Sequence, residues 1–101
     1  MAQERSRRKQ IQPGTGPERA FGDALRQVRK RAGISQERLA LDAGFDRTYV
    51  SLIERGIQSP TIRTVVRLAG ALGVTPSEIV VRMEALLDSS TGPKAKRRRS
   101  A

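Results

Sequence analysis

Apolar side chains recur every three or four positions through the middle of the chain, which is the period of an amphipathic α-helix. Glycine, proline and small polar residues interrupt this pattern at short intervals and divide it into five segments. β-branched residues cluster at 65–66 and 79–81, but both clusters keep the helical period and neither predicts a strand. The pattern therefore predicts an all-α protein, a compact bundle of five short helices.

Start and stop signals place these helices near residues 17–32, 35–43, 46–55, 61–72 and 75–88. The first four each end at a glycine, which suits the left-handed conformation that closes many helices. The expected helix starts are Pro17, the N-cap candidates Ser35, Asp46 and Thr61, and the capping box Thr75-Pro76-Ser77-Glu78. A folded region of this size is marginally stable alone, which favours a partner subunit.

Charge is distributed unevenly along the chain, which has 20 basic and 10 acidic side chains and a net charge of +10. Residues 1–16 hold four basic side chains and one acidic one, and residues 92–101 hold five basic ones. Both ends lack the apolar content to order themselves. We therefore predict a disordered basic N-terminal arm over 1–16, a domain over 17–88 and a disordered basic tail over 89–101. Such ends usually approach a polyanion, although tails that only aid solubility are the alternative.

The composition argues against several other classes of protein. Cysteine and histidine are absent, so disulfides, thiolate or imidazole metal sites and the commonest general base are all missing. We expect no enzyme activity, no metal and no cofactor. No run approaches the roughly 18 apolar residues that cross a membrane, and no apolar segment follows the basic N-terminus. We expect a cytoplasmic protein.

The helix near 46–55 has an unusual exposed side. At about 100° per residue, Val50 and Ile53 share the core face. The other side carries Arg47, Thr48, Ser51 and Leu52. An arginine fork suits guanine, hydroxyl groups can bond to several bases, and apolar groups meet the thymine methyl. A short helix that follows another across a glycine turn is the helix-turn-helix arrangement. An ordinary surface helix is the alternative interpretation.

The stretch SQERLALDAGFDRTYVSLIERGIQSPTIRTVVRLAGALGV, residues 35–74, resembles the phage-repressor and Cro-type (Xre-like) helix-turn-helix family. The resemblance covers roughly residues 21–82 and implies a lambda repressor-like fold. The motif Asp46-Arg47-Thr48-Tyr49, with Ser51 and Ile53-Glu54-Arg55 after it, is similar to restriction–modification controller proteins in particular.

The resemblance implies a role for individual side chains. It implies base contacts from Arg47, Thr48, Ser51 and Leu52. It implies DNA backbone contacts from Gln36, Tyr49, Arg55, Gln58 and Ser59. Gln36 would also brace the third helix. Leu52 departs from the polar residues common at its position, which favours contact with a methyl group or simple exposure.

The resemblance also implies an ion pair between Arg29 on the first helix and Glu54 on the third. A partly buried pair would hold the two helices together. The alternative is a loose surface pair, worth about 0–1 kcal/mol.

The last helix carries more apolar side chains than one core contact requires. They are Ile79, Val80, Met83, Leu86 and Leu87. We predict that this stripe forms a homodimer interface, because a twofold dimer spaces two recognition helices about 34 Å apart. Packing over the end of the bundle is the alternative.

Two classes of function fit these observations. The first is a homodimeric, sequence-specific transcription regulator that binds a palindromic operator in double-stranded DNA on the nucleoid, with no small-molecule ligand. The second is a protein-interaction module, such as a bridging factor or an antitoxin, whose tails bind nucleic acid without specificity.

Overall fold

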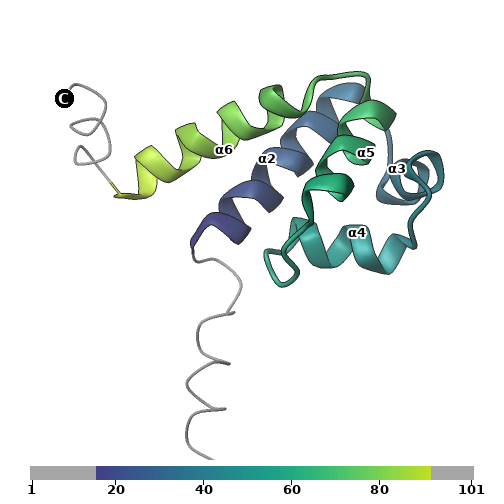
Figure 1. Cartoon of the computed structure of the whole chain (residues 1–101), viewed down its shortest axis with the longest axis horizontal. Helices are drawn as coiled ribbons and strands as arrows, with labels where there is room; N and C mark the ends of the chain where they lie inside the picture. Colours follow the sequence, from purple (N-terminus) through teal and green to yellow (C-terminus); the bar gives the residue numbers. More distant parts are fainter. Residues whose placement is uncertain (1–15, 92–101) are drawn as a thin grey trace, which may run out of the picture.

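Five helices and no strand make up residues 16–91, the part of the chain that the computed structural model describes (Figure 1). The helices are α2 (Gly16–Ala32), α3 (Gln36–Ala43), α4 (Arg47–Glu54), α5 (Ile62–Leu72) and α6 (Pro76–Thr91). The predicted all-α architecture and the order of the helices are confirmed.

Two helices extend further than the sequence pattern predicts. α2 begins at Gly16, and α6 continues to Thr91, so residues 89–91 are helical and their assignment to a disordered tail is wrong. The reason is local, because Ser89, Ser90 and Thr91 are weak helix formers but not helix breakers. The first strong stop signal after residue 88 is the glycine–proline pair at 92–93. The rest of the two basic tails lies outside the described residues.

Three predicted N-caps form hydrogen bonds and one does not. The Ser35 and Thr61 hydroxyls each accept from the backbone N–H three residues on, at 3.0 and 3.1 Å. Thr75 and Glu78 form the expected capping box, with distances of 3.2 and 3.3 Å between side-chain oxygens and backbone nitrogens. Asp46 stands at the N-cap position of α4, but its side chain makes no capping bond. The predicted N-cap position of Asp46 is therefore confirmed, but the capping hydrogen bond expected from its side chain is absent.

Two glycines fix the position of α4. Gly44 has a φ of 81°, which allows the chain to leave α3 and turn into α4 within three residues. Gly22 lets α2 approach the end of α4, because a Cβ atom there would lie 2.4 Å from the carbonyl oxygen of Ile53. α4 is thereby held against both α2 and α3.

The core lies between α2, α3, α4 and the two C-terminal helices, and α6 lies along α2 (Figure 1). Its largest fully buried side chains are Leu25, Leu39, Val50, Ile53, Leu68 and Ile79. Ile79 has no exposed surface, so its assignment to a dimer interface is wrong. The amphipathic stripe of α6 is wide because one of its edges enters the core of the same chain.

No single described helix has the length and apolar content to cross a membrane. Among the described helices, only α5 and α6 taken together have this length and apolar content, and the pair is bent by 106° at the break between them.

Candidate nucleic-acid interface

The exposed side of α4 carries the residues that the sequence assigns to base contacts. Arg47 and Thr48 are exposed, and Ser51 and Leu52 are half-buried. On the opposite side of the helix, Val50 and Ile53 have no exposed surface. The predicted division of α4 into a core face and a polar outer face is confirmed, while base contact by these four residues stays a prediction.

The ion pair between Arg29 and Glu54 is present and joins α2 to the last turn of α4. Nε and Nη2 of Arg29 donate to the two carboxylate oxygens at 2.6 and 3.0 Å. The side chains are only 10% and 2% exposed, so this is not a loose surface pair. Nη1 of Arg29 also donates to the carbonyl oxygen of Ile34, at 3.0 Å. All charged atoms of the pair therefore have partners, as a buried pair requires.

Gln36 connects this buried pair to the outer face of α4. Its Nε2 donates to Oε1 of Glu54 at 2.9 Å, and its Oε1 accepts from Nη1 of Arg47 at 3.5 Å. Because Glu54 can only accept here, the amide oxygen of Gln36 is directed toward Arg47. Gln36 thus ties α3 to the last turn of α4 through Glu54, in line with the bracing role that the resemblance implies, and makes only a long contact with Arg47. Its contact with a DNA phosphate stays a prediction.

Tyr49 joins α4 to α5. Its hydroxyl shares a hydrogen bond with the Thr64 hydroxyl at 3.1 Å, and Thr64 is buried. The Tyr49 ring stands edge-on to Phe45, with 5.1 Å between centroids. The Arg67 guanidinium of α5 also lies over the Phe45 ring, 4.7 Å from its centroid. Tyr49 is half-buried, so its structural role is in place and its predicted backbone contact is untested.

The loop from α4 to α5 carries the other predicted backbone contacts. Arg55, Gln58 and Ser59 are all exposed. The backbone N–H groups of Ile57 and Gln58 both donate to the carbonyl oxygen of Leu52, at 3.0 and 3.2 Å. These bonds hold the loop close to the end of α4. The geometry places a set of polar and basic side chains beside the exposed side of α4.

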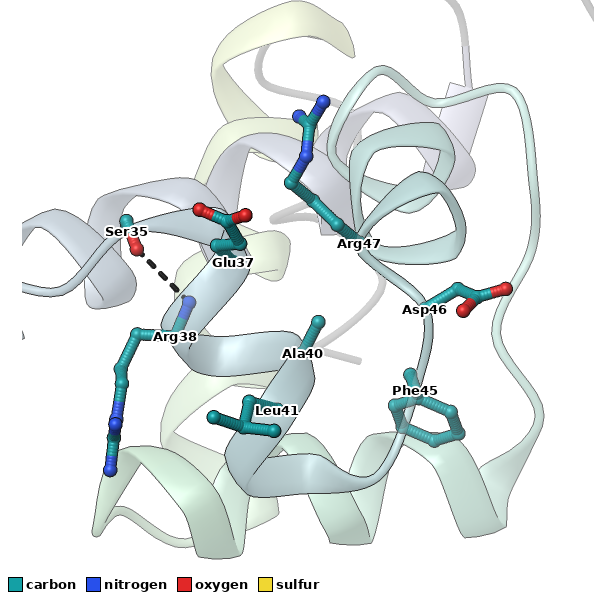
Figure 2. Close-up of a pocket in the computed structure, with 8 residues that line it drawn as sticks. All are labelled: Ser35, Glu37, Arg38, Ala40, Leu41, Phe45, Asp46 and Arg47. Atoms are coloured by element: carbon teal, nitrogen blue, oxygen red, sulfur yellow. Dashed lines mark hydrogen bonds between the residues drawn. The ribbon is translucent and has the colours of Figure 1, made fainter.

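A pocket of about 520 Å³ opens beside the start of α4, between α3 and the turn (Figure 2). Ala40, Leu41 and Phe45 supply its apolar part, and charged residues stand around them. Figure 2 shows that the side chains of Asp46 and Arg47 leave the chain in different directions.

Among residues 16–91, no three histidine, cysteine, aspartate or glutamate side chains gather as a metal site would require.

An apolar surface lies on α5 and α6, and the sequence prediction found only part of it. A groove of about 230 Å³ is lined mostly by apolar residues, which are Pro17, Phe21, Pro60, Ile62, Val65, Val80 and Met83, together with Glu18 and Ser59. The exposed fractions of Ile62, Val66 and Val81 are 81%, 52% and 59%. We call these three residues with Val80, Met83, Leu86 and Leu87 the α5–α6 surface. Ile62 and Val66 are spaced one helical turn apart on α5, a signal that could have revealed them.

Comparison with known proteins agrees with this geometry. The helix-turn-helix (HTH_3) family model matches residues 25–79. The control protein C.BamHI of Bacillus amyloliquefaciens is 38% identical over 61 residues, which cover 59% of this chain and 75% of that protein. The crystal structure of the restriction-modification controller protein C.AhdI from Aeromonas hydrophila has 40% sequence identity and a TM-score of 0.61, and the match covers 61% of this chain and 94% of that one.

A further solved structure is that of the restriction-modification controller protein C.Esp1396I, a tetramer in complex with its natural 35 base-pair operator. It has 25% sequence identity and a TM-score of 0.65, and the match covers 70% of this chain and 93% of that one. The chain belongs to the helix-turn-helix (HTH_3) family of DNA-binding transcription regulators.

Proposed function

We propose that this protein is a homodimeric regulator of transcription that reads a palindromic DNA operator through α4, and that it acts in the cytoplasm on the nucleoid. The observation that carries the proposal is how firmly α4 is fixed to the rest of the fold. Its outer side is exposed or half-buried, Val50 and Ile53 on its apolar side have no exposed surface, and its last turn is tied to α2 by a buried ion pair. A recognition element must be rigid, because small displacements misalign its contacts with base edges.

Base reading would come from the outer face of α4. The Arg47 guanidinium can donate two hydrogen bonds to O6 and N7 of guanine, and the Thr48 and Ser51 hydroxyls can donate or accept. Leu52 can meet a thymine methyl group. In the free protein Nη1 of the exposed Arg47 makes only a long contact with Oε1 of Gln36, at 3.5 Å, so its guanidinium is free to turn toward a base.

Backbone contacts would come from the edges of this face. Gln36, Arg55, Gln58 and Ser59 can bond to phosphates, and such contacts set the register of the protein on the duplex without reading its sequence. Tyr49 would add a phosphate contact from its own hydroxyl, which also forms a hydrogen bond with the Thr64 hydroxyl.

Dimerisation would use the α5–α6 surface. Ile62, Val80 and Met83 line an apolar groove there, and a second copy of the chain would cover it by twofold symmetry. A dimer is also what a palindrome requires, since each half-site receives one α4. C.Esp1396I, the relative bound to its operator, is itself an assembly of several chains.

Binding-site selection with the purified full chain, followed by titration of selected and random duplexes at one salt concentration, tests the proposal. A regulator binds the selected site at least about 10³-fold more tightly than random DNA, and the motif is palindromic. Near-equal affinities would instead support the interaction module with tail-driven binding. Sedimentation of the free protein and of the complex shows whether the dimer forms.

A further inference from the structure

The carboxylate of Asp46 has no hydrogen-bond or ion-pair partner among the described residues, although it stands at the start of α4. The equivalent side chains of α3 and α5, Ser35 and Thr61, each accept a bond from their own helix. Asp46 makes no such bond and is exposed. In Figure 2 its carboxylate points away from the Arg47 side chain and out of the turn.

In the free protein this exposed carboxylate is hydrated and makes no bond to its own helix, so it is available to a partner. A free Asp46 side chain forgoes the stabilisation that a capping bond gives to a helix. On DNA it would also stand beside phosphates of the same charge sign, since the start of the recognition helix enters the major groove. A hydrogen-bond donor on a base edge would offset both losses.

The major groove offers such donors at two bases. Cytosine presents its N4 amino group, and adenine presents its N6 amino group next to the acceptor N7. The N7 lone pair repels a carboxylate, which has no proton to give, so adenine suits an amide side chain instead. Cytosine carries no acceptor on this edge. The carboxylate of Asp46 therefore matches cytosine better than any other base.

We propose that Asp46 accepts a hydrogen bond from N4 of cytosine and so determines one base position in each half-site. This inference rests on the proposed function and names a further specificity-determining residue of α4. Asp46 and Arg47 leave the chain in different directions, so they would read different bases. The pair would then select a cytosine and a guanine close to each other.

The test is binding-site selection with the full-length wild type and with Asp46→Asn. The wild type should require cytosine at one position of each half-site, and thymine there should weaken binding about tenfold. Asp46→Asn should move the preference at that position from cytosine to adenine, since an amide both donates to N7 and accepts from N6. Ser35→Ala is the matched control, because it removes a capping bond that exists. It should lower the thermal midpoint and leave the motif unchanged.

The outcomes separate this inference from the proposed function. If Asp46→Asn keeps the wild-type motif and tightens selected and random duplexes equally, Asp46 acts only by repulsion and the inference is wrong. If the wild type selects a motif that lacks such a cytosine, the inference fails and the regulator function stands. If the wild type selects no motif at all, both fail.

Discussion

The buried ion pair between Arg29 and Glu54 offers the sharpest test of how α4 is held. We consider the variants Arg29→Ala, Glu54→Ala and the double variant. In the wild type Glu54 accepts two bonds from Arg29, at 2.6 and 3.0 Å, and one from Gln36, at 2.9 Å. Arg29→Ala leaves a carboxylate that is only 2% exposed in the wild type with the Gln36 bond alone. Glu54→Ala leaves a guanidinium that keeps the carbonyl oxygen of Ile34.

These contacts set the size and order of the losses. Removing one partner of a buried pair costs about 3–5 kcal/mol, and we assign the upper value to Arg29→Ala and the lower to Glu54→Ala. A domain of this length has a total stability of about 4–11 kcal/mol, so either loss is a large part of the whole. The double variant leaves no unpaired buried charge. Its loss should therefore be smaller than the sum of the single losses by about 2–3 kcal/mol.

Urea unfolding followed by circular dichroism, at one protein concentration for all variants, measures these free energies. The exposed pair between Arg38 and Asp42, at 3.2 Å, is the matched control, and its double-mutant cycle should give a coupling below about 0.5 kcal/mol. Strictly additive losses for Arg29 and Glu54 would show that the two side chains do not interact. A larger loss for Glu54→Ala than for Arg29→Ala would refute the order deduced from their burial.

Further predictions concern packing, assembly and the basic ends. Gly22→Ala should destabilise the fold by at least about 2 kcal/mol, because its Cβ would meet the α4 backbone. Gly70→Ala has open space around it and should stabilise the fold by about 0.5–1 kcal/mol in the same unfolding assay. Met83→Asp should produce monomers in sedimentation that bind a full palindrome poorly; a wild type that is monomeric at tens of micromolar, with and without DNA, would contradict this. Deleting residues 1–15 and 92–101 should make the slope of log K against log salt concentration shallower, by about 0.9 for each phosphate that the two ends neutralise. The deletion should also weaken binding to selected and random DNA alike.

The helices and most of their caps could be predicted from the sequence because the signals are local. The capping bonds of Ser35 and Thr61 join residues within one helical turn, and the closing glycines carry their own conformational preference. Asp46 stood at the same kind of position, but whether its carboxylate bonds to the helix or to solvent depends on how the whole turn is oriented. A sequence pattern contains no information on that choice.

Contacts between distant segments could not be predicted from the periodicity of the sequence either. The stripe on α6 marks apolar residues, but it does not say that Ile79 faces the core while Val81 stays exposed. The placement of Arg67 over Phe45 depends on the crossing of α5 with the turn before α4. The Arg29–Glu54 pair was predicted only because the chain resembles a known family, since nothing local links the two positions.

The central claim is that α4 reads base edges, and Arg47→Ala tests it most directly. Arg82→Ala, which removes the same charge from α6 where Nη1 of Arg82 donates to Gln27 at 3.1 Å, is the matched control. Fluorescence anisotropy across a salt series gives the affinities for the selected and the random duplex. Arg47→Ala should cost about 1–3 kcal/mol on the selected site, relax the preference at one position of each half-site and hardly change random binding. Arg82→Ala should leave the motif unchanged. Equal weakening of both duplexes by Arg47→Ala would make Arg47 a phosphate contact and would contradict the claim that it reads a base.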